Sequence, residues 1–144
     1  MNSRLIKLLF SCAVGLYISL VCFNNVFDYS SNFPFVNMVA KMGDTFSKEK
    51  NGWRSINNSF LHYVLFILIV AWELLIAVLV WLGCFKMISK LRALAIEFKN
   101  AKKYTSFGLS LGVLLWFIVF ITIGGEWFLM WQSKSGMPNK LHFF

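Results

Sequence analysis

Three long apolar runs alternate with polar segments along the chain, covering residues 5–23, 60–85 and 106–131. Each run is long enough for a helix that crosses the hydrocarbon core of a bilayer, which takes roughly 20 residues. Charged side chains are rare inside the runs. The pattern therefore predicts an all-α fold in which one membrane domain of 144 residues forms a bundle of three transmembrane helices.

The first run also has a feature of secretory signal peptides, because Arg4 and Lys7 place positive charge at its start. A cleaved signal would need a small-x-small site after the run, and none follows it. A lipoprotein signal would use Cys12, but the bulky Phe10 just before it disfavours that alternative. We therefore expect the first run to remain as a transmembrane helix.

The first connector, an outer loop of residues 24–59, is expected to contain a helix of its own. Asn32 and Pro34 favour a helix start, and apolar side chains then recur at helical spacing. These apolar positions are Phe35, Val39, Met42 and Phe46. We expect residues 34–45 to form an amphipathic helix on the outer membrane surface.

The second connector, residues 86–105, combines a basic face with an apolar stripe of Ile88, Leu91, Ala95 and Phe98. The second helix is expected to continue beyond the bilayer or to turn along its inner surface, where anionic lipid headgroups would favour the basic face. A merely solvated helix is the alternative. The last segment, residues 133–144, contains Gly136 and Pro138 and is predicted to be an irregular tail.

Composition excludes most soluble functions, since 58% of the residues are hydrophobic and only 14% are charged. The net charge of +8 would indicate a nucleic-acid partner in a soluble protein, but here the basic residues lie at the ends of apolar runs. No nucleic-acid partner is therefore expected.

The basic residues also predict the orientation in the membrane. One side of the predicted topology holds eight basic residues, namely Arg4, Lys7, Lys86, Lys90, Arg92, Lys99, Lys102 and Lys103. The other side holds six, so the N-terminus is expected in the cytoplasm and the C-terminus outside.

Glu73 is the first candidate for a functional residue, because it lies near the middle of the second run. A charge at that depth costs at least about 2.5–3.5 kcal/mol, so the residue needs a reason to be there. It could be a proton or cation site, or it could contact a charged residue of another membrane subunit. The structural alternative is an interhelical hydrogen bond to a hydroxyl of Ser11, Ser19, Ser110 or Thr122.

A second group of polar residues is predicted at the outer ends of the helices, consisting of Asn24, Asn25, Asp28, His62 and Glu126. Carboxylates, amides and an imidazole at the mouth of a bundle could bind a cation or a polar headgroup. The alternative is that they cap helix ends at headgroup level.

Small residues mark the positions where helices are expected to approach closely. The stripe Ser11, Gly15 and Ser19 lies on the first helix, and Gly108 with Gly112 lies on the third. Gly124 and Gly125 permit a kink or a close contact near the end of the third helix. Whether these contacts join helices of one chain or of two chains is open.

Cysteine and histidine usage points to no cofactor. Cys12, Cys22 and Cys84 lack metal-ligand spacing and are expected to be packed thiols, of which only Cys12 and Cys84 could meet. A bis-histidine haem would need both His62 and His142, and the latter belongs to the tail. No motif for hydrolysis or nucleotide use is present, so no catalytic residue, metal or cofactor is predicted.

Several motifs resemble those of a bacterial family of predicted small integral membrane proteins catalogued as a domain of unknown function. They are Asn24-Asn25-Val26-x-Asp28-Tyr29, Asn32-Phe33-x-Phe35-Val36, Trp53-Arg54, the mid-span Glu73, and Gly124-Gly125-Glu126-Trp127-Phe128-x-Met130-Trp131-Gln132-Ser133. The likeness covers residues 4–133, and the last motif is its most specific part. The resemblance implies a bacterial inner-membrane protein and no particular reaction.

Three functional hypotheses follow. The first is a non-enzymatic accessory or scaffold subunit that acts by helix association, with a membrane-protein partner or with further copies of itself. The second is a proton- or cation-handling membrane protein that uses Glu73. A membrane enzyme, or a component that binds quinone or lipid, is a third alternative without a supporting motif.

Overall fold

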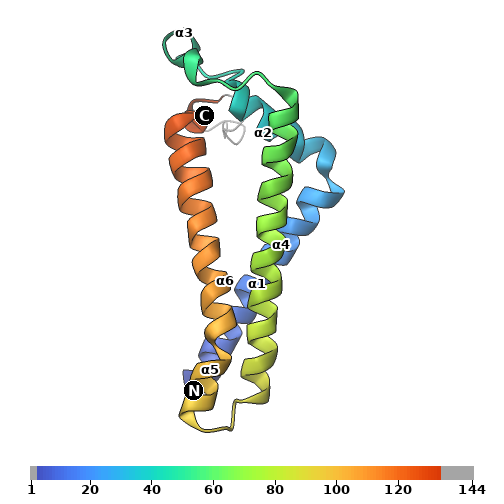
Figure 1. Ribbon diagram of the computed structural model, residues 1–144, viewed down its shortest axis with the longest axis vertical. Coiled ribbons are helices and arrows are strands. Elements are labelled where there is room, and N and C mark those ends of the chain that lie inside the picture. The colour runs from blue at the N-terminus through green and yellow to red at the C-terminus, as the bar shows by residue number, and fades with distance from the viewer. Residues whose placement is uncertain (1–2, 134–144) are drawn as a thin grey trace, which may run out of the picture. The chain divides into compact units, whose positions relative to one another are not determined.

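The computed structural model describes residues 3–133 and consists mainly of helices (Figure 1). Within these residues three helices have the length and apolar composition to cross a membrane: Ser3–Phe27, Ser59–Ser89 and Ala95–Trp127. The first is α1 and the second is α4, whereas the third combines α5 (Ala95–Ala101), α6 (Lys103–Leu114) and η2, a π-helical segment of Leu115–Trp127. The predicted all-α fold with three transmembrane helices is confirmed.

The chain divides into two compact units. Among the described residues, the first unit contains residues 3–27 and 70–114, which are α1, the second part of α4, α5 and α6. The second unit contains residues 28–69 and 115–133, which are the long loop with its short helices, the first part of α4, and the end of the third span.

In the first unit, α1 and α6 both pack on α4. The buried residues of α1 are Leu8, Ser11, Gly15, Ile18 and Cys22, and they alternate at spacings of three and four. This spacing keeps one seam facing a neighbouring helix at a shallow crossing angle. Val80 of α4, which is fully buried, lies beneath both Gly15 of α1 and Gly108 of α6. The second part of α4 is therefore the central helix of this unit.

The N-terminal end of α1 is tied to the loop that follows α4. The guanidinium of Arg4 donates hydrogen bonds to the carbonyl oxygens of Leu91 and Ala93, at 2.9 and 2.7 Å, and lies over the ring of Phe98. Because Gly15 contacts the Val80 region further along, α1 runs antiparallel to α4. The Arg4 end of α1 and the basic connector consequently lie at the same end of this unit.

The helix α1 is longer than the apolar run that predicts it. It was expected to span residues 5–23, but it continues to Phe27 and includes Asn24 and Asn25 in its last turns. The reason is tertiary, because Asn25 follows Ile18 and Cys22 on the buried seam and finds a partner there. The polar pair therefore belongs to the helix and not to the loop after it.

The basic connector is helical in part. Helix α4 extends beyond its apolar run to Ser89, a turn follows, and α5 occupies Ala95–Ala101. Lys90 and Glu97 form an ion pair at 3.5 Å, and the ammonium of Lys86 lies 3.8 Å from the centre of the Tyr104 ring. The ion pair joins the turn after α4 to α5, and the contact of Lys86 with Tyr104 joins α4 to α6.

In the second unit, the long loop contains α2 (Tyr29–Lys41), α3 (Lys48–Asn51) and the 3-10 turn η1 (Gly52–Arg54). Helix α2 packs on the start of α4 through aromatic rings: Phe66 meets Tyr29 and Phe33 edge to face, with ring centres 5.3 and 5.8 Å apart. The backbone amide of Ile56 donates to the carbonyl oxygen of Ala40, which holds the end of the loop against α2.

The amphipathic helix expected over residues 34–45 has different bounds in the structure. It begins at Tyr29, where the carbonyl oxygen of Asp28 accepts two backbone hydrogen bonds, so Pro34 lies inside the helix. It ends because Met42 adopts a left-handed conformation, with φ of 51°. Met42 and the exposed Phe46, both expected on its apolar face, therefore lie beyond its end.

The third span also ends earlier than the expected residue 131. The amide of Phe128 donates to the carbonyl oxygen of Ile123, and Leu129 then turns the chain in a left-handed conformation into η3 (Met130–Gln132). Met130 consequently folds back over the buried Gly124, its sulfur 3.7 Å from where a Cβ would stand. The irregular tail was expected at residues 133–144, of which residues 134–144, including His142, lie outside the described residues.

Candidate functional site

The carboxyl group of Glu73 is buried inside the first unit. Only 1% of this residue is exposed, and its Oε2 accepts a hydrogen bond of 2.7 Å from the amide Nδ2 of Asn25. Asn25 is brought there by the seam of α1, one helical turn beyond Cys22, whose sulfur lies 4.0 Å from the carbonyl oxygen of Val70. The pair joins the end of α1 to the middle of α4.

The four hydroxyls considered as partners of Glu73 bond elsewhere. Each donates to a carbonyl oxygen of its own helix: Ser11 to Lys7, Ser19 to Gly15, Ser110 to Ser106, and Thr122 to Phe117. Ser19 additionally accepts a hydrogen bond from the indole nitrogen of Trp81 at 3.0 Å. Glu73 therefore makes an interhelical hydrogen bond, but its partner is Asn25 and not one of these four hydroxyls.

The pair joins an ionisable group to a neutral amide. Among the described residues, the partner of the Glu73 carboxyl group is the amide of Asn25, and no ion pair involves Glu73. An amide donor satisfies one oxygen of the carboxyl group whether or not that group carries a proton. A buried carboxyl group held in this way can fix helix positions, and it can also take up or release a proton.

The small-residue stripes are used inside the first unit. A Cβ at Gly15 would stand 3.2 Å from a side-chain carbon of Val80, and one at Gly108 would stand 3.0 Å from Val80 and Leu79. At Gly112 the nearest atom, on Ile76, is 3.8 Å away. Gly15 and Gly108 therefore mark true close approaches between helices of one chain, while Gly112 has ordinary space.

The closest approach lies at a residue that sequence reasoning missed. A methyl group on Gly83 of α4 would overlap the backbone nitrogen and the hydroxyl oxygen of Thr105 on α6. The hydroxyl of Thr105 in turn donates to the carbonyl oxygen of Val80 at 3.4 Å. Gly83 lies alone in an apolar run, without a second small residue four positions away, so no stripe marked it in the sequence. Gly124 and Gly125 have no such helix contact, because their nearest atoms belong to their own segment.

Of the five polar residues expected at the outer helix ends, Asn24 and Asn25 belong to the first unit, and Asp28, His62 and Glu126 belong to the second. The amide of Asn25 donates a hydrogen bond to Glu73, and Asn24 is exposed. The carbonyl oxygen of Asp28 accepts backbone hydrogen bonds at the start of α2. The imidazole of His62 is fully buried, and its Nε2 donates to the carbonyl oxygen of Ile56 at 2.8 Å. Within residues 3–133, no three carboxylate, cysteine or histidine side chains come together in a way that could hold a metal ion.

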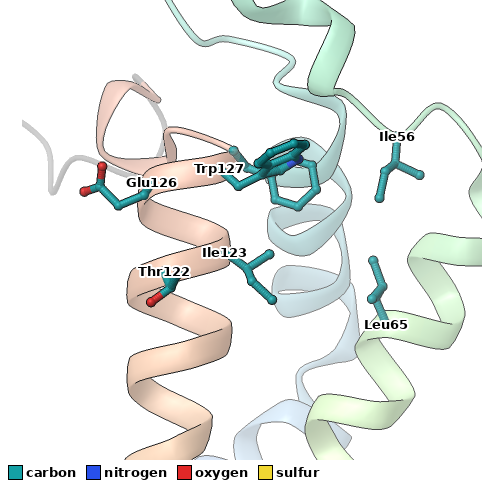
Figure 2. A pocket seen from close by; sticks show the side chains of 7 residues that line it. Ile56, Leu65, Thr122, Ile123, Glu126 and Trp127 are labelled. Carbon is teal, nitrogen blue, oxygen red and sulfur yellow. The ribbon is translucent and has the colours of Figure 1, made fainter.

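An apolar pocket of about 570 Å³ lies in the second unit (Figure 2). Its walls come from the end of the long loop, the start of α4 and the end of η2, and the lining residues are Ile56, Leu65, Thr122, Ile123, Glu126, Trp127 and Phe128. Figure 2 shows that Ile56, Leu65 and Ile123 point toward one another, whereas the carboxylate of Glu126 and the hydroxyl of Thr122 are directed away. The inner surface of the pocket is therefore formed by apolar side chains.

The final motif, residues 124–133, holds the long loop in place. The hydroxyl of Ser47 donates to Gln132 Oε1 at 2.5 Å, and the hydroxyl of Ser133 donates to the carboxylate of Asp44 at 2.7 Å. Trp127 meets Trp53 edge to face, with ring centres 5.7 Å apart. These contacts give the motif a structural role that its spacing alone did not reveal.

Comparison with known proteins identifies similarity at the level of a family. The model of a family described as "Predicted small integral membrane protein (DUF2165)" matches residues 3–144. No curated protein and no solved structure matches the chain.

Proposed function

The chain belongs to this family of small integral membrane proteins, as its motifs predict, and we propose that it acts there as a non-enzymatic accessory or scaffold subunit through helix association. The observation that carries the proposal is the exposure of the third span. Only 11% of its most apolar window is buried by the chain itself, against 28% for each of the other two spans. The third span therefore has the most surface available to another helix.

The association face that we propose lies on η2 and consists of Ile118, Thr122 and Glu126. All three are exposed, and they follow one another at a spacing of four residues. Thr122 and Glu126 point away from the pocket (Figure 2). A carboxylate beside an apolar span favours a partner helix that carries Lys, Arg or a polar side chain. Glu73 is too deeply buried for such a contact, so Glu126 takes the role that the sequence offered to Glu73.

The experiment combines crosslinking with purification from the native membrane. A photoreactive residue placed at Ile118 is expected to capture a stoichiometric membrane protein, and the same residue at Leu20, an exposed position on α1, is not. Glu126→Gln is expected to lose most of that protein, while Glu73→Gln and the loop control Glu49→Gln keep it. A natural chain that purifies alone, or only with copies of itself, would refute the accessory role.

A second candidate function rests on the burial of Glu73. An ionisable side chain with 1% exposure inside a membrane span is a candidate site for proton or cation handling. Glu73→Gln keeps an oxygen that accepts from Asn25 but cannot carry a proton or a charge. If the protein moves protons in liposomes, this variant is expected to abolish the flux while leaving the protein folded. Flux that persists in Glu73→Gln would exclude the residue as the site.

For the location, we propose a bacterial inner membrane with the N-terminus in the cytoplasm and the C-terminus in the periplasm. The hydrogen bonds of Arg4 to the loop after α4 support the placement of both basic segments on one side. That basic end would favour anionic headgroups. Single cysteines at Lys48 and Arg92 in a cysteine-free chain test the orientation. An impermeant reagent is expected to label position 48, and not position 92, in intact cells.

A further inference from the structure

The apolar pocket of the second unit has a cation at its edge. The guanidinium of Arg54 lies over the ring of Trp127, which lines the pocket, with 5.5 Å between its central carbon and the ring centre. Its Nη1 lies 3.5 Å from the carbonyl oxygen of Glu126, another lining residue. The apolar pocket thus has a positively charged guanidinium at its edge.

The hydrogen-bonding capacity of Arg54 is not used up by the protein. Its Nε is buried and has no hydrogen-bond partner in the described part of the chain. The carboxylate of Glu126, the nearest acid in sequence to Trp127, points away from the pocket (Figure 2). The guanidinium of Arg54 lies against two indole rings, those of Trp53 and Trp127, whose centres are themselves 5.7 Å apart. Its planar fork of N–H donors suits a phosphate.

We propose that this pocket binds an anionic phospholipid, with one acyl chain against Ile56, Leu65 and Ile123 and the phosphate on Arg54. The pocket lies where η2 ends and α4 begins, and tryptophans at the ends of spans are typical of headgroup depth. Its volume falls within the range of pockets that bind small molecules. The site goes beyond the proposed association face, because Thr122 and Glu126 point away from the pocket while the lipid would occupy it.

The test measures lipid retained by the full-length protein in mild detergent, by native mass spectrometry. The probes are phosphatidylglycerol and phosphatidylcholine with identical acyl chains, and a short-chain phosphatidylglycerol. The natural protein is expected to retain the long-chain phosphatidylglycerol preferentially. Arg54→Gln is expected to weaken retention about ten-fold, the loss that follows removal of a charge-assisted hydrogen-bonding group.

Two matched controls separate the site from general effects. Lys48→Gln removes a charge from an exposed position of the same loop and is expected to retain the lipid. Ile123→Trp fills the pocket and is expected to lose it, whereas Ile121→Trp places the same bulk on an exposed position of η2 that does not line the pocket. Folding of each variant is followed by its unfolding midpoint, and Arg54→Gln provides the test if Ile123→Trp does not fold.

Three results would overturn the proposal. One is equal retention by Arg54→Gln and Lys48→Gln, which would mean that Arg54 does not hold the headgroup. Another is unchanged lipid retention by a folded Ile123→Trp variant, which would show that the acyl chain does not occupy the pocket. The last is displacement of the lipid by inorganic phosphate or equal binding of the short-chain lipid, because either would reduce the site to a phosphate site.

Discussion

The contacts inside one unit of the molecule differ in kind from the contacts inside the other. In the first unit, helices approach closely at Gly15, Gly83 and Gly108, and a few hydrogen bonds cross between them. In the second unit, aromatic rings such as Phe66 and Trp127 fill the space, and hydroxyl and amide groups fasten the loop to the end of the third span.

The difference reflects the surroundings of each set of contacts. Lipid chains are as apolar as leucine, so helices within a bilayer gain little from burying large apolar side chains and instead gain from close backbone packing. At the ends of spans, rings with polar edges suit the headgroup region and bridge the helix to its loop. Substitutions that enlarge a side chain should therefore lower the stability of the first unit most. Substitutions that remove side-chain atoms should lower the stability of the second unit most.

The largest effect is expected from Phe66→Ala in the second unit. Phe66 is 4% exposed and meets Tyr29 and Phe33, so its loss leaves a hole that the helices cannot fill. The free energy of unfolding should fall by about 3 kcal/mol, as measured by denaturant titration in detergent. Phe60→Ala, on the same helix but 71% exposed, is the control and should change little. Equal effects of the two variants would contradict the aromatic packing of α2 on α4.

An intermediate effect is expected from Gly83→Ala in the first unit. The added methyl group meets the backbone nitrogen of Thr105, which can move only with α6, so the free energy of unfolding should fall by about 2 kcal/mol. Gly112→Ala is the matched control, because it has 3.8 Å of space and gains up to about 1 kcal/mol of helix propensity. If Gly83→Ala is as stable as Gly112→Ala, α4 and α6 do not cross at this residue.

The smallest effect is expected from Gln132→Ala. The variant removes the acceptor of the Ser47 hydroxyl, which is worth about 1 kcal/mol, and so loosens the loop without unfolding the spans. Amide hydrogen exchange in Lys48–Asn51 should become about five-fold faster, while exchange in α6 stays unchanged. Asn57→Ala, which removes an exposed hydrogen bond to Ser55 in the same loop, should leave Lys48–Asn51 unaffected. Acceleration in α6 as well would mean that the loop and the spans unfold together.

Much of the candidate site could be anticipated from single residues, and its partners could not. Glu73 attracts attention because a carboxyl group is costly inside an apolar run, whatever surrounds it. Its partner Asn25 lies 48 positions away and was assigned to the loop, since asparagine in an apolar context usually ends a helix. Only the packed seam of α1 explains why the helix continues to Phe27.

Gly83 and Arg54 show the same limit. Gly83 does not belong to a small-residue motif in the sequence. The close contact that it permits is seen only where Thr105 packs against it. In the sequence Arg54 is notable only as part of the Trp53-Arg54 motif, and the pocket beside it depends on residues from three separate segments.

Three long apolar runs are enough to identify a membrane protein with three spanning helices, because hydrocarbon admits only long apolar segments whose backbone groups bond internally. The resemblance to the family is likewise visible in the sequence, and the match of the family model over residues 3–144 confirms it. The folded chain was needed to show which faces of the helices meet, where α1 and the third span end, and which donor reaches Glu73. Those outcomes depend on contacts between distant residues, and lipid-facing and helix-facing positions are equally apolar in the sequence.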